Sequence, residues 1–79
     1  MLRLVLEEIT PDIVTYRYYP EHDTKYGLVS VNRKTTEMWD KKLAANDEFG
    51  SYFVHAISAI RNIIKANKKL PRKRLVAWY

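Results

Sequence analysis

The chain is 79 residues long, carries a formal net charge of +5 and contains no cysteine. This length suits one domain with a small core, and the lack of cysteine excludes disulfides and thiolate chemistry. No stretch reaches the ~20 apolar residues of a membrane-spanning helix, and the apolar run at the N-terminus is too short for a secretory signal. We therefore expect a single α+β domain over residues 1–79, located in the cytoplasm.

The first half of the chain has the pattern of β-strands. Apolar, β-branched and aromatic residues recur at every second position, which is the period of a strand with one face on a core. Turn-forming residues separate these runs. In the second run, Val14, Tyr16 and Tyr18 share one face. The four predicted strands are Leu2–Glu7, Ile13–Tyr19, Tyr26–Asn32 and Thr36–Lys41.

One amphipathic helix is predicted from Asp47 to Lys68, and Gly50 in its first turn leaves an earlier start, near Lys41, open. A rotation of about 100° per residue gathers its apolar side chains into an arc roughly 160° wide, which is ample for a core-facing helix. Asn46 and Asp47 suit the start, because their side chains can cap a helix and carboxylates favour its positive end. Pro71 prevents much further helix. The predicted apolar face contains Phe49, Phe53, Ala56, Ile57, Ile60, Ile63 and Ile64, with Tyr52 and Ala59 at its edge.

The last residues, Arg74–Tyr79, are mostly apolar and aromatic, whereas loose termini are usually polar, so we expect a final strand there. The element order is then β-β-β-β-α-β. It describes an antiparallel β-sheet, a meander plus a C-terminal strand, with one long amphipathic helix packed on one face. A helix that returns the chain across the sheet places the last strand antiparallel to the first. The expected spatial order is 5-1-2-3-4.

Five short patterns run through the chain: Tyr16-x-Tyr18-x-Pro20-Glu21, Gly27-x-Val29-x-Val31, Thr35-x-Glu37, His55-Ala56 and Trp78-Tyr79. Together they resemble small uncharacterised bacterial α+β proteins of similar length. The resemblance covers most of the chain and contains no chemical signature. It implies the same architecture and a bacterial cytosolic setting, and it transfers no functional site.

The sequence offers no constellation of residues for catalysis, a cofactor or a metal. His22 lies in a polar turn, and adjacent turn residues do not normally converge on one target. His55 shares the polar side of the predicted helix with Ser51 and Ser58, without an acid nearby for a triad. Two histidines this far apart, with no cysteine, lack the spacing of zinc ligands. We expect no enzyme and no catalytic, cofactor or metal site.

Positive charge is concentrated near the C-terminus. Residues 1–48 contain nine acidic and seven basic residues, whereas residues 49–79 contain seven basic residues and no acid. Such a cluster can bind phosphates and release counterions. A solvated surface is the plainer explanation, because cations are favoured in the last turn of a helix. The candidate residues for contact with a polyanion are Arg61, Lys65, Lys68, Lys69, Arg72, Lys73 and Arg74.

The chain is rich in aromatic residues, with six tyrosines and two tryptophans, and some of them form a second candidate surface. A two-layer domain leaves one sheet face open, where aromatic residues could contact a protein partner, a second copy of the chain or the bases of single-stranded nucleic acid. Packing in the core and across strands accounts for about half of these aromatics. The candidate interface residues are Tyr16, Tyr18, Tyr19, Trp39 and Trp78.

The favoured interpretation is a small non-enzymatic binding module that acts through protein–protein contact or self-association. The alternative is a nucleic-acid-binding accessory protein that uses the basic 61–74 segment.

Overall fold

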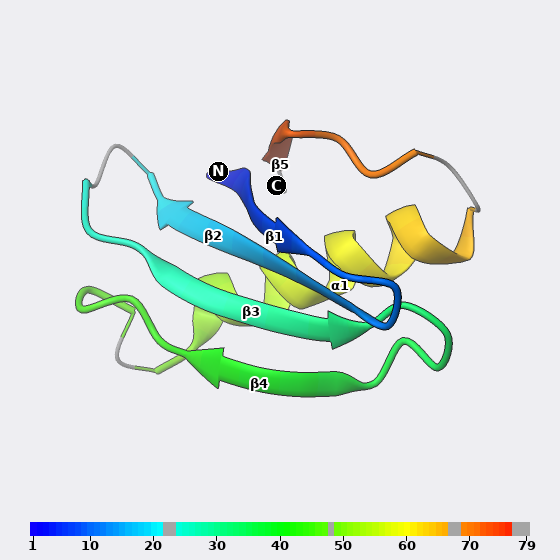
Figure 1. The fold of residues 1–79 in the computed structure, drawn as a ribbon. Coiled ribbons are helices and arrows are strands. Elements are labelled where there is room, and N and C mark those ends of the chain that lie inside the picture. Colours follow the sequence, from blue (N-terminus) through cyan, green and yellow to red (C-terminus); the bar gives the residue numbers. More distant parts are fainter. Residues whose placement is uncertain (22–23, 48, 67–68, 77–79) are drawn as a thin grey trace.

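The computed structural model describes residues 1–21, 24–47, 49–66 and 69–76. They form a five-stranded sheet in the order β4-β3-β2-β1-β5, with one helix packed on one face (Figure 1). Each neighbouring pair of strands is antiparallel. The predicted fold class and strand order are confirmed. The elements are β1 (Leu2–Ile9), β2 (Ile13–Pro20), β3 (Gly27–Asn32), β4 (Met38–Lys42), α1 (Ser51–Lys65) and β5 (Lys73–Val76).

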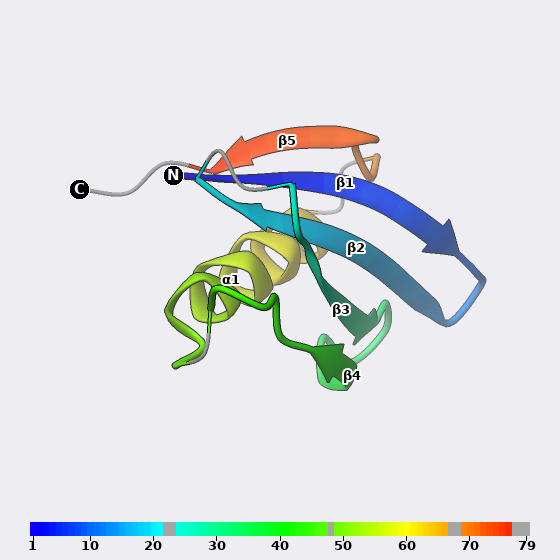
Figure 2. The same ribbon diagram turned by 90° about the vertical axis from the view of Figure 1, so that its left-hand side faces the viewer.

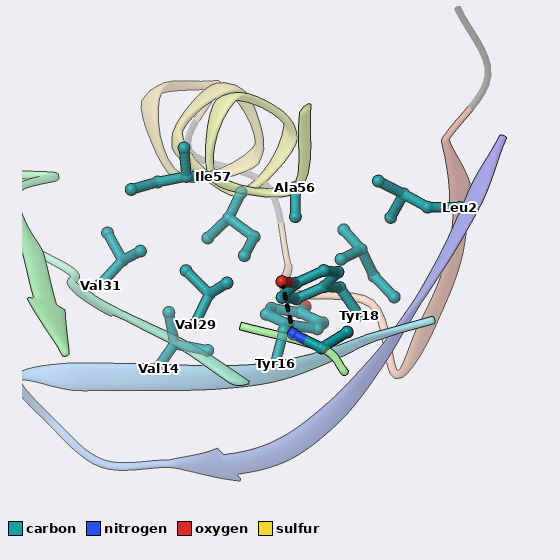
Figure 3. Packing of buried hydrophobic residues seen from close by; sticks show 11 residues of the cluster. Leu2, Val14, Tyr16, Tyr18, Val29, Val31, Ala56 and Ile57 are labelled. Carbon is teal, nitrogen blue, oxygen red and sulfur yellow. Dashed lines mark hydrogen bonds between the residues drawn. The ribbon is translucent and has the colours of Figure 1, made fainter. Parts of the chain in front are cut away.

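The core lies between the helix and the sheet face that it covers (Figure 3). Side chains alternate between the two faces of a strand, and the predicted core face of β2 is confirmed, because Val14, Tyr16 and Tyr18 have no exposed surface. Residues of α1 close the core from the other side. Outside β2, the buried apolar residues are Leu2, Leu4, Val29, Val31, Ala44, Ala56, Ile57, Ile60 and Ile63.

Tyr18 fixes the entry of the chain into the helix. Its hydroxyl accepts a hydrogen bond from the Ala44 N–H at 2.9 Å and donates one to the carboxylate of Asp47 at 2.9 Å. The buried Asp47 carboxylate also accepts hydrogen bonds from the backbone N–H groups of Tyr52 and Phe53, at 3.0 and 2.9 Å. These N–H groups belong to the first turn of α1, where donors lack partners within the helix. Asp47 therefore caps the helix, as predicted for this region.

The helix begins at Ser51, four residues later than predicted. Gly50 precedes it in the left-handed backbone conformation, with φ of 73°, and glycine adopts this conformation without steric cost. The turn brings the carboxylate of Asp47 back to the helix N-terminus. Phe49 consequently lies before the helix and is 89% exposed, so its predicted place on the apolar face is wrong. The rest of the predicted face is buried or half-buried.

Tyr16 fixes the exit of the chain from the helix. Its hydroxyl donates a 2.6 Å hydrogen bond to the carbonyl of Pro71, in the connection between α1 and β5. The Leu6 N–H then donates to the carbonyl of Arg72 at 2.7 Å, immediately before β5 pairs with β1. The predicted last strand is confirmed over residues 74–76, and β5 (Lys73–Val76) begins one residue earlier than predicted. Its predicted continuation through residues 77–79 lies outside the described residues.

Gly27 leaves room for the ring of Tyr18. The two residues are paired across β2 and β3. A Cβ atom at Gly27 would lie 2.3 Å from a ring carbon of Tyr18 and 2.5 Å from the carbonyl oxygen of Lys42. Both distances are far below van der Waals contact, and the second atom belongs to the backbone. The absence of a side chain at Gly27 thus lets the Tyr18 ring reach Ala44 and Asp47.

We predict that Asp47→Ala lowers the free energy of unfolding by about 2–4 kcal/mol, because a cap is worth about 1 kcal/mol and an unsatisfied buried hydrogen-bonding group costs about 1–3 kcal/mol. Urea denaturation followed by circular dichroism measures the change. Asp12→Ala is the control, since Asp12 is exposed and forms only a surface ion pair with Lys34. It should change stability by less than about 1 kcal/mol. Equal, small losses in both variants would contradict the capping role.

Candidate interaction surface on the open sheet face

The helix covers one face of the sheet, and no other described element covers the opposite face (Figure 2). We call this opposite side the open face. In β1, β2 and β3, the residues between the buried positions point to it, because strand side chains alternate. In β4 and β5, the residues paired with those positions share this face. These residues are Arg3, Val5 and Glu8 of β1, Ile13, Thr15, Arg17 and Tyr19 of β2, Leu28 and Ser30 of β3, Asp40 and Lys42 of β4, and Lys73 and Leu75 of β5.

Cationic and aromatic side chains stack at one end of the open face. The guanidinium of Arg3 lies 4.9 Å from the ring centre of Tyr19, and that of Arg17 lies 4.6 Å from the ring centre of Tyr26. The two tyrosine rings are 5.3 Å apart and tilted by 50°. Both the cation–π and the tilted aromatic geometries are attractive. The result is a continuous stack in the order Arg3, Tyr19, Tyr26, Arg17.

Glu7 holds Arg17 in this stack. The Glu7 carboxylate forms an ion pair with the Arg17 guanidinium, including a 3.1 Å hydrogen bond from Nη2 to Oε1. This hydrogen bonding lowers the pKa of Glu7 and raises the pKa of Arg17. Glu7 reaches the open face because it is the extra residue of a β-bulge, where the pairing of β1 with β2 shifts between Leu6 and Glu8. The bulge therefore contributes a carboxylate that orients a surface arginine.

A groove of about 590 Å³ lies beside this stack, along strands β1 and β5. We call it the β5 groove. Leu75, which is 60% exposed, lies in it with the cations of Arg3 and Lys73, and the described lining residues include no acid. The described residues that line it are Arg3, Leu4, Val5, Tyr19, Thr24, Lys73, Arg74 and Leu75.

Glu8, Trp39 and Asp40 lie together at another part of the open face, which we call the Trp39 corner. They line a hollow of about 270 Å³ with Thr10, Ile13, Thr15 and Ser30. Trp39 is 68% exposed and is the extra residue where the pairing of β3 with β4 shifts. The lining contains two carboxylates and no cation, which is the reverse of the β5 groove.

The structure corrects two of the predicted interface residues. Tyr16 and Tyr18 were expected among the aromatics of an open surface, but both rings lie entirely within the core. They share the strand face of Val14, so a helix over that face necessarily covers them. Tyr19 and Trp39 do lie on the open face, and Trp78 is outside the described residues. Arg3, Lys73 and Leu75 were missed as neighbours of Tyr19, although the register between β1 and β5 brings them together.

The basic segment does not form one continuous surface. Arg61 is half-buried and donates a 2.8 Å hydrogen bond to the carbonyl of Thr36, in the β3–β4 connection. Lys69 and Arg74 instead line a hollow of about 180 Å³ near the C-terminal end of α1. Lys73 points to the open face, because neighbouring strand residues face opposite ways. Lys65 and Arg72 are exposed, and Lys68 lies outside the described residues.

Within the part of the chain that the structure describes, no helix is long and apolar enough to cross a membrane, and no three His, Cys, Asp or Glu residues gather as metal ligands. His55 is half-buried on α1, and His22 is outside the described residues. No family model matches the chain, and neither the curated proteins nor the solved structures contain a match.

The buried tyrosines predict a loss of stability at high pH. Burial raises the pKa of Tyr18 to about 12 and also raises the pKa of Tyr16, whereas an unfolded tyrosine titrates near 10. The free energy of unfolding should therefore keep its full value below about pH 10 and fall as the pH rises toward 12. Chemical denaturation at several pH values measures this. Tyr18→Phe should lose less stability over that interval than the wild type, and equal losses would contradict the assignment.

Proposed function

We propose that this chain is a small non-enzymatic binding module that acts through protein–protein contact or self-association on its open sheet face. We also propose the bacterial cytoplasm as its setting, on the strength of the sequence resemblance. The observation that carries the proposal is the β5 groove, where the exposed Leu75 lies beside Lys73 and the Arg3–Tyr19 contact.

This combination of side chains is favourable for a protein interface. Arginine and aromatic residues are enriched at the centres of interfaces, where they bury a large area and still make directed contacts. The stack restrains Arg3, Arg17, Tyr19 and Tyr26 before a partner arrives, which reduces the entropy lost on binding. Covering Leu75 would in addition remove apolar surface from water.

The same face is less suited to single-stranded nucleic acid. Base stacking needs a free aromatic ring face, and the ring of Tyr19 already contacts both Arg3 and Tyr26. Trp39 has a largely free ring, but Glu8 and Asp40 lie next to it and repel phosphates. Nucleic-acid binding is therefore the second proposal. It rests on the cations Lys65, Lys69 and Arg74 near the end of the helix.

The primary proposal predicts site-specific cross-linking. A photoreactive p-benzoylphenylalanine placed at Leu75 should cross-link to a protein in cells that naturally express the chain, and the yield should fall several-fold when Lys73→Glu is added. Val54 on α1 is a matched control position, since it is 59% exposed and Leu75 is 60% exposed. The photoreactive residue at position 54 should cross-link to no protein. Equal yields from both positions, or none from Leu75, would overturn the proposal.

The second proposal predicts a mobility shift with nucleic acid that weakens steeply as salt increases. The triple variant Lys65→Glu, Lys69→Glu and Arg74→Glu should abolish the shift. Its control, with an equal change in charge elsewhere, is Lys25→Glu, Lys34→Glu and Lys42→Glu, which should retain a measurable shift. Equal losses in both triple variants would indicate dependence on net charge alone, and no shift at low salt would remove this proposal.

A further inference from the structure

We propose that the β5 groove is occupied by Trp39 of a second copy of this chain, in a symmetric dimer whose open faces pack against each other. The inference rests on the proposed function and names the partner. Two exposed features of one face require an explanation, namely a groove lined by cations and a tryptophan flanked by carboxylates.

The charges of the two features are complementary. Among the described residues, the β5 groove contains Arg3 and Lys73 and no acid, whereas the Trp39 corner contains Glu8 and Asp40 and no cation. Within the described part of the chain, Lys73, Glu8 and Asp40 take part in no ion pair. In a two-fold dimer, one contact is made twice, so each groove meets the corner of the partner. Lys73 of each groove then faces the Glu8 and Asp40 carboxylates of the partner.

The register places the two features far apart on the face, as such a dimer requires. Arg3 pairs with Tyr19 and Leu75 near the start of β1. Glu8 lies near the other end of β1, in a row that continues through Thr15 and Ser30 to Asp40 on β4. Strands β4 and β5 form opposite edges of the sheet, about 19 Å apart at ~4.8 Å per strand.

In this dimer, the two-fold axis lies midway between the two packed sheets and parallel to them. It runs perpendicular to the line that joins the β5 groove to the Trp39 corner. Rotation about this axis places the Trp39 corner of each copy over the β5 groove of the other. Because that line runs obliquely to the strands, the strands of the two copies cross at a steep angle. Orthogonal crossing is one of the two common ways in which sheets pack face to face.

The side chains also fit in their chemistry. Trp39 would bring its indole to Val5 and Leu75, which supply apolar surface, and to Arg3 and Lys73, which can approach the ring as cations. Tryptophan is among the residues that contribute most to interface affinity when such a pocket covers it. An acidic peptide would satisfy the groove but leave the Trp39 corner exposed. A second copy covers both features, and for that reason we favour it.

The size of the face places the proposed dimer among small interfaces, which are typical of weak complexes. Five strands and about six residues span roughly 24 by 20 Å, a plan area of about 500 Å². A standard interface buries about 800 Å² per partner. We therefore expect a weak dimer with a Kd of roughly 10–100 μM, and the experiment must reach concentrations above that range.

Sedimentation velocity on the full chain, from about 5 to about 500 μM, tests the dimer over a range that brackets this affinity. Trp39→Ala should weaken association by about tenfold or more, and Trp39→Phe should weaken it less. Asp40→Lys and Lys73→Glu should each weaken association. Both changes in one chain should restore the Kd to within about threefold of the wild type, because each altered charge then faces its opposite on the partner. Lys69→Glu matches Lys73→Glu in charge and should have no such effect.

Fluorescence provides a second readout. The chain has two tryptophans, so Trp78→Phe leaves Trp39 alone, and its emission should shift to shorter wavelength as the dimer forms. A strict monomer, or a dimer indifferent to both Trp39→Ala and the charge exchange, would overturn the inference. If the chain is a monomer but position 75 cross-links to a different protein, the dimer fails and the binding function stands. If the chain is a monomer and position 75 cross-links to no protein, both the dimer and the proposed binding function fail.

Discussion

The hydroxyl groups of Tyr16 and Tyr18 hold both connections of the helix against the sheet. Tyr18 bonds to Ala44 and Asp47 before α1, and Tyr16 bonds to Pro71 after it. Their rings meanwhile fill the core, as Figure 3 shows. A buried hydroxyl is costly without a partner, so these bonds also determine where the two connections run. In this small domain, the position of the helix depends on two side chains of one strand.

This arrangement decides which surface remains for binding. With the helix fixed over one face, the residues between the buried positions of β2 point away from it, and Arg17 and Tyr19 join the stack on the open face. Two β-bulges then supply groups that regular alternation would not, namely Glu7 beside Arg17 and Trp39 beside Asp40. The separation of a cationic groove from an acidic corner follows from these local features. Both the proposed binding function and the proposed dimer depend on it.

Much of the fold could be predicted because it depends on local patterns. The period of two placed Val14, Tyr16 and Tyr18 on one strand face, and the helical period identified Ala56, Ile57 and Ile60 as core residues, all of which are buried. The exact start of the helix could not be predicted in this way. It depends on the left-handed turn at Gly50 and on a hydrogen bond from Tyr18, which is distant in sequence from Asp47. Phe49 was misplaced for that reason.

By itself, the sequence determined the element order, the two faces of each strand and the apolar side of the helix, since all three follow from spacing along the chain. Only the tertiary structure decided which face the helix covers. That choice buried Tyr16 and Tyr18, which the sequence had offered as interface residues, and left Tyr19 half-buried on the open face. It also divided the basic segment, because Arg61 reaches the β3–β4 connection while Lys73 and Arg74 point to opposite sides of β5. Periodicity assigns a residue to a face, but contacts between distant segments decide whether that face is core or surface.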